Sequence, residues 1–129
     1  MITLDGPTFA SAVHGSEYQF AFRNIQRNDD VPCAVCRVTG ANTVLMVPGK
    51  VDCHKDWKKQ YSGLLTANHE GHPGTSEYAC VDEHPEGIEG TRTHDDEGKL
   101  FYPARSICGS LPCPPYVNKG FLSCVVCTR

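Results

Sequence analysis

The chain has 129 residues, 40% of them hydrophobic, and a net charge of −3 at pH 7. This length fits a single domain, residues 1–129, with one modest core. This slightly acidic balance requires no basic face, so a nucleic-acid partner is not expected. The longest apolar run, Thr43–Val47, is far too short for insertion into a membrane. The first residues, Met1–Pro7, lack the basic start and apolar core of a signal peptide, so we expect a mature chain with an added Met, or a fragment.

The cysteine content points to an oxidising compartment. There are eight cysteines, together with 12 Gly and 9 Pro, in this short chain. Such density is typical of secreted domains that supplement a small core with disulfides, and Gly and Pro favour many turns. We therefore expect a secreted, extracellular protein.

The first half of the chain predicts short strands. Aromatic residues alternate with other residues over Tyr18–Arg23, and this period of two indicates a half-buried strand. Val31–Val38 is predicted as a second strand. Thr43–Val47, β-branched and apolar, is typical of a central strand. One helical turn is expected around Trp57, within Asp52–Tyr61.

The second half continues this pattern. Further strands are predicted at Leu64–Ala67, Glu77–Val81, Lys99–Tyr102 and Phe121–Thr128. Loops rich in Gly, Pro or acidic residues separate them, and no helical period of normal length occurs. The expected fold is mainly β: a small, disulfide-stapled antiparallel sandwich or barrel with long loops and little helix.

Two of these segments are similar to each other in sequence. Pro32–Arg37 resembles Ser123–Thr128, and each has cysteines at positions i and i+3. Such positions face opposite sides of a strand, so the two cysteines of one segment cannot easily bond to each other. This similarity either arises by chance between two apolar strands or indicates that the two strands lie side by side and are joined through their cysteines.

Disulfides are favoured over zinc and redox chemistry for these cysteines. The two CxxC motifs lie much farther apart than the roughly 15–20 residues of zinc modules. Neither motif precedes a helix that would lower a thiol pKa. Among the 105 possible pairings, proximity and the strand pattern predict Cys53–Cys80 and Cys108–Cys113, with Cys33 and Cys36 bonded to Cys124 and Cys127 in either register.

The sequence contains no catalytic motif. The stretch His69–His72 is not the zinc-protease motif, because its histidines are three positions apart and Gly71 and Pro73 disfavour a helix. Paired carboxylates at Asp82–Glu83 and Asp95–Glu97 are expected to be surface charge. Calcium binding is the alternative, although EF-hand spacing is missing. We predict no enzyme activity, no metal site and no cofactor.

Polar and aromatic groups on one loop are the best candidates for a binding site. Sugars present hydroxyl groups beside an apolar C–H patch, so a sugar site needs hydrogen-bonding groups next to an aromatic face. The predicted sugar-binding residues are Asn68, His69, Glu70, His72, Glu77 and Tyr78. Tyr61 is the alternative aromatic face. The rival locations are Arg92–Glu97 and Tyr102–Arg105, and an ordinary solvated turn is the simplest competing explanation.

A family resemblance supports this interpretation. The order of VPCAVCR (31–37), VLMVPGKVDC (44–53), YSGLL (61–65), SEYACVDEHPE (76–86), GKLFY (98–102), CGSLPCPPYV (108–117) and LSCVVCTR (122–129) resembles the short-chain collagen C4-like domain of invertebrates. Land-snail agglutinins are assigned to that family. The resemblance covers about Glu17–Arg129 and leaves residues 1–16 outside it.

The resemblance implies a lectin. By analogy with the agglutinins, we expect binding of galactose-type sugars on cell surfaces, N-acetylgalactosamine or sialylated glycans among them, in the service of innate immunity. Agglutination requires several copies, so a homo-oligomer is expected. There is no Gly-X-Y repeat, so a triple-helix function does not carry over. The alternatives are a structural matrix module without sugar affinity, suggested by the acidic stretch Asp82–Gly98, and a hydrolase.

Overall fold

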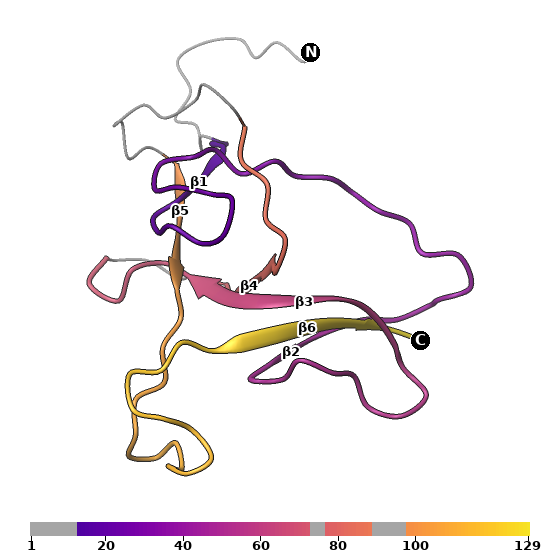
Figure 1. The fold of residues 1–129 in the computed structure, drawn as a ribbon. Helices are drawn as coiled ribbons and strands as arrows, with labels where there is room; N and C mark the ends of the chain where they lie inside the picture. Colours follow the sequence, from indigo (N-terminus) through magenta and orange to yellow (C-terminus); the bar gives the residue numbers. More distant parts are fainter. Residues whose placement is uncertain (1–12, 73–76, 89–97) are drawn as a thin grey trace, which may run out of the picture.

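The computed structural model describes residues 13–72, 77–88 and 98–129, and its regular elements are all strands (Figure 1). One open sheet contains them in the order β1-β5-β3-β6-β2, with β4 paired to β3 outside this path. The bounds are β1 Ser16–Tyr18, β2 Val44–Pro48, β3 Lys58–Ala67, β4 Ala79–Asp82, β5 Lys99–Pro103 and β6 Ser123–Thr128.

The prediction of a mainly β, disulfide-stapled fold is confirmed. The predicted sandwich or barrel takes the form of a single open sheet, and one pair of strands, β1 with β5, is parallel. The described residues contain no helix, and so none of a length and apolarity that could cross a membrane.

β6 lies between β2 and β3 and is covered on both faces. Its register pairs Val126 with Met46 of β2 and with Tyr61 of β3. Neighbouring side chains of a strand point to opposite faces, yet Cys124 and Val125 are both fully buried. The continuous apolar sequence of this strand therefore matches its central position.

A hydrophobic core cluster lies beside β1. Tyr18, Ile25 and Val81 are buried together, and four partly buried side chains pack against them: Phe20, Phe22, Val31 and Phe101. The Tyr18 hydroxyl donates to the carbonyl of Glu86 at 3.2 Å. Burial, followed by the negative charges of Cys33, Asp29 and Glu86, raises the pKa of Tyr18 above its ordinary value of 10.0.

Two predicted strands of the first half differ from the structure. The strand at Tyr18–Arg23 ends at Tyr18, because Phe22 and Ile25 exchange backbone hydrogen bonds across a turn in which Arg23 has a φ of 52°. The strand at Thr43–Val47 is confirmed as β2, but it is an edge strand and not a central one. Val44 is consequently 68% exposed.

The predicted strand at Val31–Val38 is wrong. β1 and β2 lie at opposite ends of the strand order, so the connection between them has to travel the width of the sheet. Figure 1 shows this connection as a wide arc away from the other strands. Backbone pairing resumes at Asn42 and Thr43, whose N–H groups donate to the carbonyl of Arg129.

The other strand predictions are confirmed, with shifted bounds. β3 begins earlier than predicted, at Lys58, and β4 is displaced toward Asp82. The helical turn expected around Trp57 is a tight turn, in which Trp57 N donates to the carbonyl of His54 at 3.1 Å and Asp56 has a φ of 72°. The chain then enters β3 directly.

The chain forms three disulfides, two of which end on β6. They are Cys53–Cys127, Cys80–Cys124 and Cys108–Cys113. The predicted Cys108–Cys113 bridge is confirmed, whereas Cys53–Cys80 is wrong, and so is the bonding of Cys33 and Cys36 to Cys124 and Cys127. Cys124 and Cys127 face opposite sides of β6, so each bonds to a different segment. Cys33 and Cys36 have free, exposed thiols.

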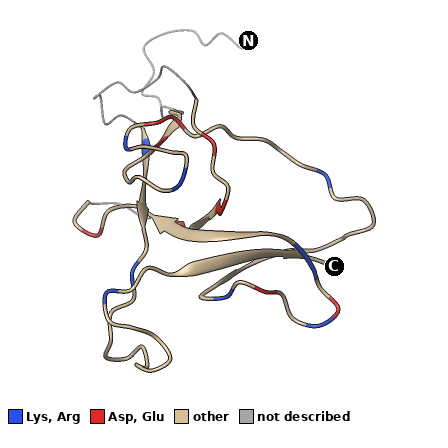
Figure 2. Ribbon diagram, in the orientation of Figure 1, with Lys and Arg blue, Asp and Glu red and all other residues tan. Residues whose placement is uncertain are grey.

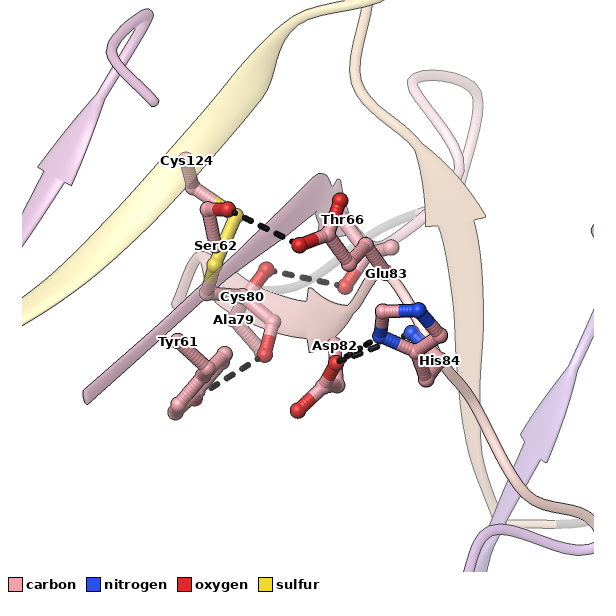
Figure 3. The surroundings of a disulfide bond; sticks show 9 residues. All are labelled: Tyr61, Ser62, Thr66, Ala79, Cys80, Asp82, Glu83, His84 and Cys124. Atoms are coloured by element: carbon pink, nitrogen blue, oxygen red, sulfur yellow. Dashed lines mark hydrogen bonds and ion pairs between the residues drawn. A yellow bond between two sulfur atoms is a disulfide. The ribbon is translucent and has the colours of Figure 1, made fainter. Parts of the chain in front are cut away.

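Figure 3 shows the Cys80–Cys124 bridge, which ties β4 to β6. Hydrogen bonds between β3 and β4 surround it. The Tyr61 hydroxyl donates to the Cys80 carbonyl at 3.2 Å, and the Thr66 hydroxyl donates to the Ala79 carbonyl at 3.1 Å. Burial, and next the charge of Asp82, raises the pKa of Tyr61 above its ordinary value of 10.0.

Candidate functional site

The candidate site lies where β3 ends, because three segments meet there. Leu65 N donates to the Leu122 carbonyl at 2.9 Å, Leu122 N to Ala104 at 3.0 Å, and Ala104 N to Leu65 at 2.8 Å. This closed set of bonds holds the end of β5 and the start of β6 against β3. The loop that follows β3 therefore emerges beside Tyr102, which pairs with Ala67.

A pocket of about 360 Å³ opens at this junction. Its size is in the range of small-ligand sites. It is lined by Ala67, Asn68, His69, Glu70, Tyr78, Tyr102, Pro103, Ala104, Arg105 and Phe121. Tyr78 and Phe121 are 61% and 67% exposed, so large aromatic surfaces stand open at its walls.

Three rings gather around His69. Its ring centroid lies 4.9 Å from that of His72 and 4.9 Å from that of Tyr102, and the Tyr102 contact is edge-on at 66°. The N–H of Gly71 donates to His69 Nδ1 at 3.1 Å. With Nδ1 accepting, the proton of the neutral ring is on Nε2, which is left to donate elsewhere. The loop thus presents an oriented histidine beside a tyrosine face.

Glu70 and Arg105 form the polar wall. Arg105 Nη2 donates to Glu70 Oε1 at 2.6 Å. Residues 98–129 contain Lys and Arg but no Asp or Glu, so the acid of this pair comes from the loop after β3 (Figure 2). The side chain of Arg105 is 43% exposed and that of Glu70 is 67% exposed, so their remaining donors and acceptors are accessible to a ligand.

The structure brings together most of the predicted site. Asn68, His69, Glu70 and Tyr78 all line the pocket. His72 does not line it but packs against the rings of His69 and Tyr102. Glu77 is exposed and lies outside the lining.

The rival locations have different outcomes. Tyr102–Arg105 belongs to the same pocket as the favoured loop, joined to it by the pairing of β3 with β5. The other rival, Arg92–Glu97, lies outside the described residues. Tyr61, the alternative aromatic face, does not line the pocket, because its hydroxyl is directed to Cys80.

Two lining residues, Ala67 and Phe121, were not among the site residues expected from the sequence. Phe121 was expected within a strand, but β6 begins only at Ser123, and Phe121 pairs with Arg105 in an isolated bridge. The available signal was its position as the first residue of the predicted strand Phe121–Thr128.

Within the described ranges, no group of three or more His, Cys, Asp or Glu side chains is arranged to hold a metal ion. Of the two carboxylate pairs considered for calcium, Asp82 accepts a hydrogen bond from the backbone N–H of His84 at 2.9 Å, while Asp95–Glu97 lies outside the described part. Comparisons with protein-family models, with curated protein sequences and with solved structures gave no match.

Proposed function

We propose that this protein is a secreted lectin, and that the pocket at the end of β3 binds a galactose-type sugar such as N-acetylgalactosamine. The observation that carries the proposal is the position of aromatic surfaces directly beside oriented polar groups in one pocket. This combination suits a sugar, whose ring has an apolar C–H face and a polar rim.

The aromatic surfaces favour galactose-type sugars in particular. The axial hydroxyl of galactose leaves a continuous C–H patch on the opposite face of its ring, which can stack on an aromatic side chain. Tyr78, Tyr102 and Phe121 provide such side chains from three different segments. An exposed aromatic wall is stable here because the disulfide-stapled sheet fixes the backbone beneath it.

The polar groups of the pocket would orient the bound sugar. A carboxylate is an acceptor and a guanidinium a fork of donors, and the Glu70–Arg105 pair offers both to neighbouring sugar hydroxyls. The N-acetyl group would need one donor for its carbonyl, which His69 Nε2 can provide. Because the pair is already formed at 2.6 Å, little ordering cost arises on binding.

Glycan-array screening followed by calorimetric titration with N-acetylgalactosamine tests the proposal. We expect array signals for terminal galactose-type sugars. Tyr102→Ala should weaken binding by about tenfold, since an aromatic contact contributes about 0.5–1.5 kcal/mol beyond area burial. Arg105→Ala should weaken it at least as much, because it leaves Glu70 unpaired.

The matched controls are Tyr116→Ala and His54→Ala. Tyr116 lines a different pocket, with Gly49 and Lys50, and His54 lies in the turn before β3. Both variants should bind as the wild type does. An array without signals above background, or a loss of affinity as large in Tyr116→Ala as in Tyr102→Ala, would contradict the proposed site.

The second candidate function is an extracellular matrix module without sugar affinity. The acidic stretch Asp82–Gly98 favours it, since clustered carboxylates suit mineral or basic matrix partners. Binding to mineral or collagen together with an empty glycan array would support this candidate and exclude the lectin.

A further inference from the structure

Two cysteines remain available in a chain whose other six are bonded. Cys33 and Cys36 are both free and exposed. The three disulfides indicate an oxidising environment, in which unbonded exposed thiols do not persist as such. These two thiols therefore require partners that the folded chain does not supply.

The thiols cannot readily satisfy each other. They are three positions apart in a segment, Val31–Val38, that contains no turn. In an extended backbone these positions point to opposite sides, which separates the sulfur atoms. A bond between these two thiols is therefore disfavoured, and both are exposed to a second chain.

The backbone of the same segment is open. Val31 donates to the Ser16 carbonyl, but the following residues 32–38, which precede a turn at 39–40, make none of the recorded backbone-to-backbone hydrogen bonds. Val35, between the two cysteines, is fully exposed. A β-type segment with open backbone groups and an exposed apolar residue is a template for pairing with another strand.

β6 shows what this sequence pattern does when it is paired. The segment Ser123–Thr128 has the same cysteine spacing as Pro32–Arg37, and both of its cysteines are bonded and buried. Two strands cover its backbone. The Val31–Val38 segment, in the arc between β1 and β2, thus has the sequence pattern of a paired strand, but no strand of the described chain pairs with it.

We propose that Cys33 and Cys36 join this protein covalently to a second copy of itself, through pairing of the two Val31–Val38 segments. A second copy brings free thiols at the same segment, whereas every other cysteine of the chain is already used. Figure 1 shows the connection from β1 to β2 as an arc that runs away from the other strands, so a second copy can approach it from the solvent.

The chemistry is thiol–disulfide exchange with a low-molecular-weight disulfide as oxidant. A Cys33 or Cys36 thiolate attacks the oxidant, forms a mixed disulfide and releases one thiolate. A thiolate of the second copy then attacks the mixed disulfide, forms the interchain bond and releases the second thiolate. Each interchain bond removes two protons and two electrons from the protein and reduces one oxidant molecule to two thiols.

Non-reducing electrophoresis and intact-mass measurement test this proposal, after the chain has been incubated with oxidised glutathione. We expect a reductant-sensitive dimer for the wild type and none for Cys33→Ser/Cys36→Ser. Val35→Asp should lower the dimer fraction severalfold, because charge repulsion opposes strand pairing. Val117→Asp, at a residue 72% exposed elsewhere on the surface, is the matched control and should dimerise normally.

Four results would overturn the proposal. They are a monomer with an internal Cys33–Cys36 bond, a monomer that carries glutathione on both cysteines, a dimer that persists in the double serine variant, and an equal loss of dimer in Val35→Asp and Val117→Asp. The last would show that the cross-link forms by random collision of thiols and not by pairing of the segments. None of these results depends on sugar binding.

Discussion

Gly63 is the residue where β3 has to accommodate two neighbours at once. It pairs with Asp82 of β4 and with Cys124 of β6. A Cβ atom at this position would overlap the carbonyl oxygen of Val81, which is backbone and cannot rotate away. The close approach of β4 to β3, which carries the Cys80–Cys124 bridge, therefore depends on the missing side chain.

Gly63→Ala should be strongly destabilising. Overpacking in a fixed core costs about 1–3 kcal/mol, and here β4 has to move. Chemical denaturation should show a lower midpoint of unfolding. Gly15→Ala is the control, since a Cβ at Gly15 would meet nothing within 4 Å. Equal midpoints for the two variants would show that β4 can shift without cost.

At the scale of elements, the sequence predicted strands well where pairing was dense. β6 lies within the predicted strand Phe121–Thr128, and its burial on both faces explains why the apolar pattern is continuous. Val31–Val38 has nearly the same pattern but forms no strand within the chain. The local sequence pattern indicates whether a segment can pair as a strand, whereas the topology of the chain decides whether another strand lies close enough to pair with it.

The candidate site was predictable in part for the same reason. The loop residues Asn68, His69 and Glu70 are adjacent in sequence, so their polarity could be recognised together. Tyr102 and Arg105 were taken as a rival location, because only the pairing of β3 with β5 shows that they share the pocket. Disulfide partners were likewise missed where they depend on which face of β6 a cysteine occupies.

A bridge between two strands and a bridge within one loop should differ in their contribution to the free energy of unfolding. Cys80–Cys124 spans 44 positions and Cys108–Cys113 only 5. In the chain-entropy model, bridges of these lengths contribute about 4 and about 2 kcal/mol. Replacing both cysteines of the longer bridge by Ala should therefore lower the thermal midpoint much more than the same change in the shorter one. Similar losses measured by scanning calorimetry would contradict this ranking.

The whole molecule has a small core for its length. Among the described residues, only seven hydrophobic side chains are buried, and three of the largest fully buried ones lie on β6: Val125, Cys124 and Cys127. A core of this size is marginal without covalent support. The Cys80–Cys124 bridge joins β4 and β6, and the residues just before these strands, Tyr78 and Phe121, line the candidate pocket.

One candidate pocket per chain limits what a single copy can do. A lectin agglutinates cells only when at least two sites act together, because the second binding event is then intramolecular. The dimer proposed through Cys33 and Cys36 would place two such pockets in one particle. Sugar affinity and agglutination should therefore separate experimentally, since they depend on different parts of the molecule.

Cys33→Ser/Cys36→Ser should retain the wild-type affinity for N-acetylgalactosamine in calorimetry and lose haemagglutination. Tyr102→Ala should show the reverse dependence: it should still form the covalent dimer in oxidised glutathione, but bind sugar weakly and agglutinate poorly for that reason. Agglutination that survives in a monomeric double serine variant would mean that valence arises elsewhere. Loss of sugar affinity in that variant would instead show that the arc and the pocket, which lie on different segments of the chain, are coupled.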